Sequence, residues 1–283
     1  MTRILLTGAN GQLGTDIVLA NTNAELHAFA RGDLDVTDPV RVLDVVGDVA
    51  PDVIIHAGAY TAVDDCEGHE KTAYQINGAG TANIVAAASR FSSRVIYLST
   101  DYVFDGTKPN PYVESDRPRP ASVYGASKLV GENAVAELGT AGLTVRTSWV
   151  CGAHGSNMVK TILRLKESHT TLTFVDDQVG KPTFTSDLAE ALMILADRDD
   201  SGIMHVTNEG VVSWYEFCRE VLRAAGDDPE RVKPCKTNEL QPQRPAPRPA
   251  NSVLANTRFS DLGLSLLRDY REPLREVVRD LTS

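Results

Sequence analysis

The stretch "LLTGANGQLGTDI", residues 5–17, decides the fold. A short apolar run leads into Gly8, Gly11 and Gly14, spaced as G-x-x-G-x-x-G, and a segment of helical period follows. In such a loop the first glycine allows a tight turn, the second lets backbone N–H groups approach a pyrophosphate, and the third lets helix and strand pack closely. A glycine triplet alone often marks only a tight turn. Its place between the first strand and the first helix predicts a dinucleotide-binding site.

Outward from this loop, short apolar runs alternate with longer segments of helical period. The expected strands are residues 3–9, 24–30, 51–59, 93–101 and 143–150, and the expected helices are 11–21, 38–50, 70–90 and 124–138. Continuous apolar runs indicate strands buried on both faces, and strand-helix repetition indicates parallel pairing with right-handed crossovers. The sequence therefore predicts an α/β fold with a doubly wound, Rossmann-type parallel sheet.

After residue 150 the pattern loosens. Helices are expected at 156–168, 185–198, 213–226 and 271–283, strands at 171–177 and 202–208, and a proline-rich segment at 240–256. Four prolines in that segment exclude a helix interior or a central strand. We expect an NAD(P)-binding Rossmann domain over 1–150 that also recovers parts of 184–210. Residues 151–283 would mainly form a smaller α/β substrate domain.

Charge and composition exclude several classes of protein. The 283 residues carry a formal net charge of -10 without a Lys/Arg run, which argues against a nucleic acid or an acidic membrane as partner. Neither a signal peptide nor about twenty consecutive apolar residues is present, so no membrane span is expected. Four cysteines lack C-x-x-C pairing and metal-ligand spacing. We interpret them as reduced thiols in a cytoplasmic protein without a metal site.

The segment "HAFARGDLDVTD", residues 27–38, bears on the choice of cofactor. In a NAD-selective site, an acidic residue that ends the second strand binds the ribose 2'-hydroxyl. Here the strand runs into Ala30 and Arg31, and an arginine can accept a 2'-phosphate. The sequence favours NADPH, or tolerance of both NADPH and NADH. The alternative is that Arg31 is only a surface cation.

A phenol and an ammonium lie four residues apart in "SVYGASKLVGE", residues 122–132. Tyr124 and Lys128 share one face of the expected helix. Reduction of a carbonyl by hydride leaves an alkoxide that must be protonated, and a neighbouring ammonium favours the phenolate of the donor. Ser99 and Thr100 end an expected parallel strand, where such sheets bind ligands. A hydroxyl there can polarise a substrate carbonyl, so these residues predict a reductase.

The stretches "TGANGQLG", "STDYVFDG" and "VYGASKLVGE" resemble the extended short-chain dehydrogenase/reductase family, with its Ser/Thr-Tyr-Lys triad. Further stretches narrow the resemblance to the branch that reduces dTDP-4-dehydro sugars: "LDVTD", "PDVIIHAGAYTAVDDCE", "NGAG", "RTSWV", "GSNMVKTILRL", "DDQVGKPTFTSDLA" and "RPANSVLAN". The resemblance covers nearly the whole chain. It implies NAD(P)H-dependent reduction of the C4 keto group of dTDP-4-dehydro-6-deoxy-L-mannose to dTDP-L-rhamnose, the last step of dTDP-rhamnose biosynthesis.

The resemblance also implies roles for individual residues. The catalytic group would be Thr100, Tyr124 as proton donor to O4, and Lys128, which would bind the ribose and lower the pKa of the tyrosine. The substrate would contact Thr100, Asp101, Trp149 and Arg248, the last through its diphosphate. The cofactor would contact Gly8, Gly11, Gln12, Leu13, Gly14, Arg31, Asp35, Val36, Ala57, Ala59, Thr61, Tyr124 and Lys128. Trp149 could instead pack in the core, and Arg248 could be a solvated linker residue.

Some features depart from the pattern or leave alternatives open. Cys151 stands where an aromatic residue is expected, and "HAGAY" replaces an alanine-rich turn. Glu272 and Glu276 could hold Mg²⁺ at a homodimer interface, although an ordinary charged helix face is favoured. The competing functions are a sugar-nucleotide epimerase or dehydratase, a reductase of another small carbonyl, and a non-catalytic NADP-binding regulatory subunit like the β subunit of methionine adenosyltransferase. A dehydratase would need an acid where Tyr102 stands.

Overall fold

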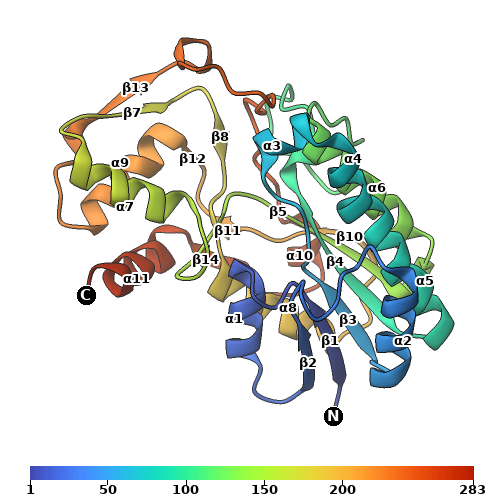
Figure 1. The fold of residues 1–283 in the computed structure, drawn as a ribbon. Helices are drawn as coiled ribbons and strands as arrows, with labels where there is room; N and C mark the ends of the chain where they lie inside the picture. The colour runs from blue at the N-terminus through green and yellow to red at the C-terminus, as the bar shows by residue number, and fades with distance from the viewer.

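The computed structural model describes residues 1–283, and a six-stranded parallel sheet forms its larger part (Figure 1). Every neighbouring pair in this sheet is parallel. Across the sheet the strands are β10 (Gly202–His205), β5 (Gly142–Thr147), β4 (Arg94–Thr100), β3 (Val53–His56), β1 (Arg3–Thr7) and β2 (Glu25–Phe29). The chain starts at the inner strand β1, adds β2 on one side and then returns to add β3, β4, β5 and β10 on the other, so the predicted doubly wound fold is confirmed.

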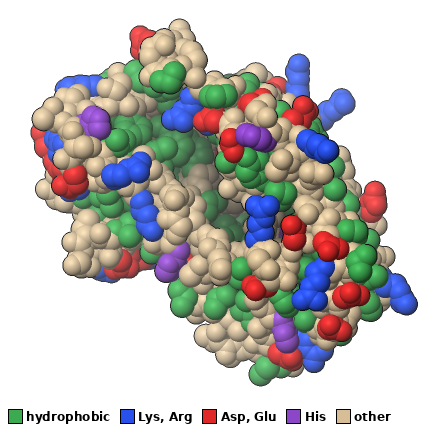
Figure 2. All heavy atoms as spheres, viewed as in Figure 1, with side chains coloured by type: hydrophobic (Ala, Val, Ile, Leu, Met, Phe, Trp, Pro, Cys, Tyr) green, Lys and Arg blue, Asp and Glu red, His purple; other side chains and the backbone are tan.

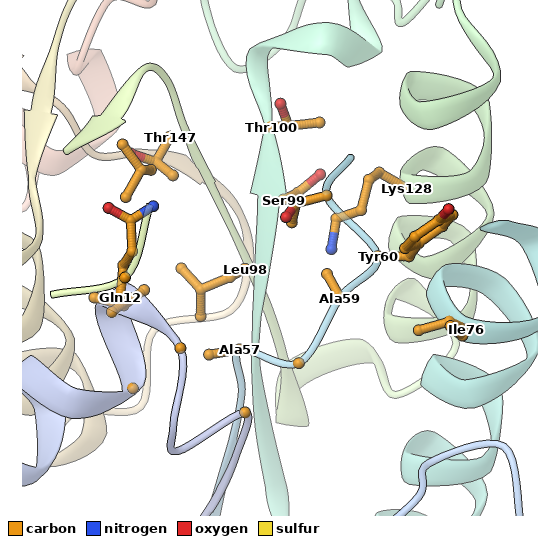
Figure 3. Close-up of a pocket in the computed structure, with 18 of the residues that line it drawn as sticks. Gln12, Ala57, Ala59, Tyr60, Ile76, Leu98, Ser99, Thr100, Lys128 and Thr147 are labelled. Carbon is orange, nitrogen blue, oxygen red and sulfur yellow. The ribbon is translucent and has the colours of Figure 1, made fainter. Parts of the chain in front are cut away.

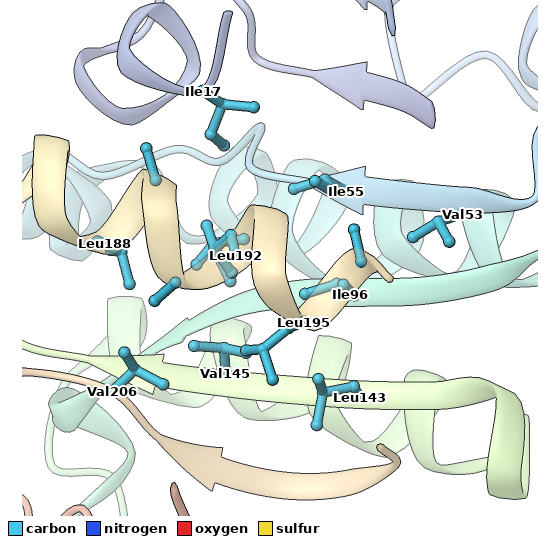
Figure 4. Close-up of a cluster of buried hydrophobic side chains, with 14 of the residues drawn as sticks. Ile17, Val53, Ile55, Ile96, Leu143, Val145, Leu188, Leu192, Leu195 and Val206 are labelled. Carbon is cyan, nitrogen blue, oxygen red and sulfur yellow. The ribbon is translucent and has the colours of Figure 1, made fainter. Parts of the chain in front are cut away.

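Helices cover both faces of the sheet because successive side chains of each strand point to opposite sides. In β1, Ile4 and Leu6 join one buried cluster and Leu5 joins another. The first cluster packs the sheet against α1 (Gln12–Ala20) and α8 (Thr185–Ala196), as Figure 4 shows. The second packs it against α2 (Pro39–Val49), α5 (Thr81–Phe91) and α6 (Val123–Ala136).

A second part of the molecule lies beside the sheet and has its own core. Its helices are α7 (Met158–Ser168), α9 (Trp214–Ala224) and α11 (Arg271–Thr282), which share a buried cluster that includes Val159, Phe217 and Leu274 (Figure 1). Short strands pair around them: β6 (Val150–Cys151) with β9 (Thr183–Phe184), β7 (Leu172–Val175) with β13 (Val232–Cys235), β8 (Val179–Gly180) with β12 (Val212–Ser213), and β11 (Asn208–Glu209) with β14 (Leu267–Asp269).

The later chain also contributes to the larger part. β10 extends the six-stranded sheet beside β5, and α8 packs against α1. Phe259 of the short helix α10 (Thr257–Asp261) joins the same buried cluster as Ile4. The boundary at residue 150 is therefore crossed by the chain more than once. No helix of the structure is both long and apolar enough to span a membrane.

The helix predicted at 70–90 is not regular. It consists of α4 (Glu70–Ala73), a π-helical stretch (Tyr74–Gly80) and α5, and the separate helix α3 (Val63–Gly68) precedes it. In the π-helical stretch, the Asn77 side chain accepts a hydrogen bond from Tyr60 N at 2.8 Å and donates one to Tyr60 O at 3.1 Å. A π-helical turn inside a helix often accompanies a functional site. Here it turns an amide toward the loop that follows β3.

The strand predicted at 143–150 ends at Thr147, because Trp149 adopts a left-handed backbone conformation with φ of 47°. A tryptophan rarely adopts this conformation, since its Cβ crowds the backbone there. The sequence pattern did not reveal this break, because Trp149 and Val150 are apolar residues that a strand also accepts.

Candidate active site

The glycine loop between β1 and α1 forms a cradle for phosphate. Gly8 has φ of +75°, and a Cβ on Gly14 would lie 2.1 Å from Gly8 O, so neither position accepts a side chain without rearrangement. Gly11 is the N-cap of α1 and supplies no side-chain hydrogen bond to the first helical N–H groups. Those N–H groups and the positive end of the helix dipole are free for an anion. The residues present thus fit the pyrophosphate of a dinucleotide.

A cavity of about 800 Å³ opens above this loop, at the carboxyl ends of the parallel strands. Figure 2 shows the surface hollowed between the two parts of the molecule. In Figure 3, Lys128 points from α6 toward Ser99 at the end of β4, and Gln12 lies across from it at the start of α1. All predicted catalytic and cofactor-contacting residues line this cavity: Gly8, Gly11, Gln12, Leu13, Gly14, Arg31, Asp35, Val36, Ala57, Ala59, Thr61, Thr100, Tyr124 and Lys128.

Thr100, Tyr124 and Lys128 meet within the cavity because β4 ends beside the first turns of α6. The Ser122 hydroxyl caps α6 by accepting a hydrogen bond from Gly125 N at 3.2 Å, which fixes the start of the helix. Tyr124 is 8% exposed and Lys128 is 2% exposed. The Lys128 ammonium lies 4.1 Å from the centre of the Tyr97 ring, a cation–π contact that directs the side chain.

Burial dominates the acid–base properties of this pair. It lowers the pKa of Lys128 to about 7, although the nearby Glu132 carboxylate acts in the opposite direction. Burial also raises the pKa of Tyr124 well above its usual value, and a hydrogen bond with Thr100 only partly offsets this. In the ligand-free cavity burial therefore dominates the pKa of Tyr124, and the expected lowering by Lys128 stays a prediction. The free energy needed to transfer the phenolate from water into the buried site exceeds the stabilisation that neighbouring groups provide.

Asp101 follows Thr100 directly and is 2% exposed. The Thr100 hydroxyl donates a hydrogen bond to Asp101 Oδ1 at 2.9 Å, whereas Oδ2 has no hydrogen-bond partner. Burial raises the pKa of Asp101 to about 6. Asp101 thus lines the cavity with its carboxylate held by Thr100 and largely shielded from solvent.

At the far end of the cavity, Arg31 and Asp35 are exposed near the end of β2. The Asp35 carboxylate accepts hydrogen bonds from Thr37 N at 2.9 Å and from the Thr37 hydroxyl at 2.8 Å. These bonds, and the Arg31 charge to a smaller degree, hold the pKa of Asp35 below its usual range. The carboxylate is thus engaged within its own turn, and Arg31 remains the group available to a phosphate.

The structure separates the predicted substrate residues. Thr100, Asp101 and Trp149 line the cavity, but Arg248 does not. The Arg248 guanidinium binds the Asp64 carboxylate through two hydrogen bonds of 2.8 and 2.7 Å. A second arginine, Arg244, approaches the same carboxylate at 3.4 Å. In this structure Arg248 therefore joins the proline-rich segment to α3, and its contact with a diphosphate stays a prediction.

Other predicted features can be placed as well. Glu276 is bound by Arg268 through two hydrogen bonds of 2.6 Å, so its carboxylate is already neutralised. No cluster of three or more metal-binding side chains is present. Cys151 is fully buried in the core of the second part and does not line the cavity. The Cys151 side chain therefore contributes no atom to the cavity wall.

Two cavity features were missed from the sequence. Asn77 fixes the loop that contains Tyr60, and its side chain also donates to Ser127 Oγ at 2.9 Å. Trp214 lines the cavity although it comes from α9 in the second part of the molecule. Asn77 lies in the "NGAG" stretch that contributed to the family resemblance, but no role was assigned to it. Trp214 carried no signal, because only the tertiary structure brings α9 to the sheet.

The glycine cradle and the Thr-Tyr-Lys cluster, on a six-stranded parallel sheet, place the chain among the extended short-chain dehydrogenases/reductases, a class of NAD(P)-dependent oxidoreductases. A family model described as "RmlD substrate binding domain" matches residues 1–283. The chain belongs to this family. The resemblance predicted from the motifs is thereby confirmed.

Individual relatives agree with this assignment. The dTDP-4-dehydrorhamnose reductase of Mycobacterium tuberculosis is 40% identical over 96% of this chain and 91% of the relative. A dTDP-4-keto-6-deoxy-D-glucose reductase of Streptomyces niveus is 38% identical over 97% and 96%. A crystal structure of the dTDP-4-dehydrorhamnose reductase of Bacillus anthracis in complex with NADP superposes with a TM-score of 0.94, at 35% identity, covering 99% of both chains.

Proposed function

We propose that this protein reduces the C4 keto group of dTDP-4-dehydro-6-deoxy-L-mannose with NADPH and so forms dTDP-L-rhamnose. The observation that carries the proposal is the convergence of Thr100, Tyr124 and Lys128 in one cavity with the glycine cradle. Relatives that match nearly the whole chain carry the name of this reductase. A homodimer and a cytoplasmic location stay predictions.

Each end of the cavity has a role in cofactor binding. The N–H groups at the start of α1 would hold the pyrophosphate, and Arg31 would pair with a 2'-phosphate. Lys128 would donate hydrogen bonds to the nicotinamide ribose hydroxyls. These bonds would stabilise the ammonium form of Lys128, which burial destabilises. NADPH supplies the hydride when it is bound. NADH would lack the phosphate that Arg31 contacts, so we infer a preference for NADPH.

The raised pKa of Tyr124 is compatible with a proton donor. It keeps the phenol protonated in the resting cavity, so the proton is available when the carbonyl is reduced. The alkoxide that hydride transfer leaves at O4 takes this proton from Tyr124. Lys128 then stabilises the phenolate that remains, and the Thr100 hydroxyl can hydrogen-bond to the reacting oxygen.

The second part of the molecule would close over the nucleotide sugar. Its loop residues Gly155 and Ser156 line the cavity together with Trp214. Asn157, the N-cap of α7, donates a hydrogen bond to Gln12 Oε1 at 2.9 Å and so ties this part to the glycine loop. We infer that residues 151–283 supply most of the substrate site, whereas β10 and α8 complete the cofactor-binding part.

A second substrate is supported by the Streptomyces niveus relative, whose name specifies dTDP-4-keto-6-deoxy-D-glucose. Both compounds are 4-keto-6-deoxy sugars on the same nucleotide, and they differ in stereochemistry on the ring. The same Tyr124 could protonate either product. The dehydratase alternative is less favoured, because Tyr102 stands where a dehydratase needs an acid.

The test is consumption of NADPH by the purified protein with each of the two keto sugars, followed by identification of the product sugar. We expect turnover with dTDP-4-dehydro-6-deoxy-L-mannose and formation of dTDP-L-rhamnose. Faster turnover of the D-glucose derivative would favour the second candidate. Tight binding of NADPH without its oxidation in the presence of either keto sugar would contradict both candidate reactions. That result would favour the regulatory-subunit alternative.

A further inference from the structure

The two tryptophans of the chain form a stack at the cavity. The ring centres of Trp149 and Trp214 lie 3.5 Å apart with an angle of 4° between the planes, and both side chains line the cavity. Aromatic pairs usually prefer offset or edge-to-face arrangements with longer separations. A close parallel stack therefore needs support from its surroundings.

The surroundings hold Trp149 in several ways. Its backbone is left-handed with φ of 47°, and its indole N–H donates a hydrogen bond to Ser252 Oγ at 3.2 Å. A Cβ on Gly180 would come within 2.5 Å of the Trp149 ring, so only glycine leaves room for it. A strained backbone persists only where neighbours over-determine it, and such residues are concentrated at functional sites.

The position of the stack identifies the portion of the substrate that it can reach. Trp149 follows the end of β5 by two residues, and Thr147 at that end pairs in register with Thr100 on β4. The stack is therefore attached to the strand ends that carry the reacting hydroxyl, whereas Arg31 and Asp35 border the opposite, adenine end. The sugar, which must place its C4 at Tyr124, would come closest to the indoles.

We propose that Trp214 is a substrate-positioning residue, which braces Trp149 and forms with it an aromatic wall against the apolar C–H face and methyl group of the 6-deoxy sugar. This inference rests on the proposed function. A 6-deoxy sugar carries a methyl group in place of a hydroxymethyl group, and an indole surface desolvates that methyl without leaving a polar group unpaired. Neither the family resemblance nor the sequence pattern assigned this role to Trp214.

The experiment compares wild-type protein with Trp214→Leu and with Trp214→Phe, which keeps an aromatic ring. Tyr215→Leu is the matched control, because Tyr215 neighbours Trp214 on α9 but does not line the cavity. Dissociation constants are measured for NADPH, dTDP and dTDP-L-rhamnose by intrinsic fluorescence, which arises here only from Trp149 and Trp214 among tryptophans, and by calorimetry. KM and kcat are measured for oxidation of dTDP-L-rhamnose by NADP⁺.

We expect Trp214→Leu to weaken the binding of dTDP-L-rhamnose by roughly three- to tenfold, the range for loss of one aromatic contact. Affinities for NADPH and dTDP should stay as in the wild type, KM should rise more than kcat falls, and Trp214→Phe should recover most of the loss. Equal losses of affinity for dTDP and dTDP-L-rhamnose would show that the tryptophan stack contacts the nucleotide and not the sugar, and would overturn the proposal. Unchanged binding, or equal effects of Tyr215→Leu, would also overturn it.

The reductase activity and the positioning role of Trp214 can be disproved separately. A wild type that oxidises dTDP-L-rhamnose, with Trp214→Leu indistinguishable from it, would leave the reductase intact and remove the aromatic wall. A wild type that binds dTDP-L-rhamnose without turning it over would contradict the reductase, and the binding comparison would still decide the role of Trp214.

Discussion

Glu132 and Arg146 form a buried ion pair directly behind the reacting groups. Arg146 Nη2 lies 2.6 Å from Glu132 Oε2, and Nε lies 2.9 Å from Oε1. The Ser99 hydroxyl donates to the same carboxylate at 2.5 Å, and Lys128 lies one helical turn before Glu132 on α6. This pair therefore connects β5, the end of β4 and the catalytic face of α6. The Glu132–Arg146 pair therefore fixes the distance between the end of β4, which carries Thr100, and Lys128 on α6.

Glu132→Gln should destabilise the protein strongly, because the variant leaves the Arg146 guanidinium, which is 0% exposed, without its counter-charge. Breaking a buried ion pair from one side typically costs about 3–5 kcal/mol. The measurement is the free energy of unfolding from denaturant titration. Glu137→Gln, at the exposed end of the same helix, is the control. A loss for Glu132→Gln no larger than that of the control would mean that the pair does not brace the site.

The buried histidines predict the acid limit of stability. His56 is 0% exposed and hydrogen-bonds to the Thr7 hydroxyl at 2.6 Å, and burial lowers its pKa to about 3. Burial lowers the pKa of His205 to about 3 as well. Between about pH 6.5 and 3 the unfolded chain binds protons that the folded protein cannot, so stability decreases as the pH falls.

Each such histidine contributes a slope of about 1.4 kcal/mol per pH unit in that window. His56→Asn should remove one contribution, so that the free energy of unfolding depends less steeply on pH between about pH 6 and 4. His69→Asn, a change at an exposed histidine, serves as control. Parallel stability curves for wild type and His56→Asn would disprove the assignment.

Gly14→Ala should disrupt the cofactor loop, because the added Cβ would lie 2.1 Å from Gly8 O and 2.8 Å from Ala9 Cα. Both neighbours are backbone, so the contact cannot be relieved by a side-chain rotation. We expect at least about a tenfold loss of NADPH affinity, the equivalent of 1.4 kcal/mol. Gly32→Ala, where a Cβ meets nothing within 4 Å, is the matched change. Wild-type affinity in Gly14→Ala would show that the loop tolerates the shift.

Arg31→Asp should weaken the binding of NADPH more than the binding of NADH, because only NADPH carries the 2'-phosphate that the guanidinium can pair with. The ratio of the two dissociation constants isolates this effect from general damage to the site. Arg41→Asp, on the exposed side of α2, changes the net charge equally and should leave the ratio unchanged. Equal weakening of both cofactors by Arg31→Asp would return Arg31 to the status of a surface cation.

The sequence was most informative where a local pattern matches a local structure. The glycine spacing of residues 8–14 and the Tyr124–Lys128 spacing depend only on chain geometry within a few residues, and the structure brings both to one cavity. Buried strands such as β3 and β4 were equally visible, because they are continuous apolar runs. The parallel sheet followed from their alternation with helices.

The remainder depends on tertiary environment. The left-handed Trp149, the π-helical turn at Asn77 and the approach of Trp214 require contacts between distant segments. Acid–base properties were also beyond the sequence. Burial outweighs the effect expected from a neighbouring lysine at Tyr124, and the degree of burial is set by the whole cavity. Nor could the sequence show that Arg248 pairs with the Asp64 carboxylate and does not line the cavity.

The most direct test of the central claim is the turnover of Tyr124→Phe beside the wild type, with NADPH and dTDP-4-dehydro-6-deoxy-L-mannose, together with the NADPH dissociation constant of each. The account predicts NADPH oxidation by the wild type and a loss of about a hundredfold or more in kcat for the variant, the usual contribution of a general acid. NADPH affinity should be nearly unchanged. Turnover of Tyr124→Phe close to that of the wild type would contradict Tyr124 as the proton donor.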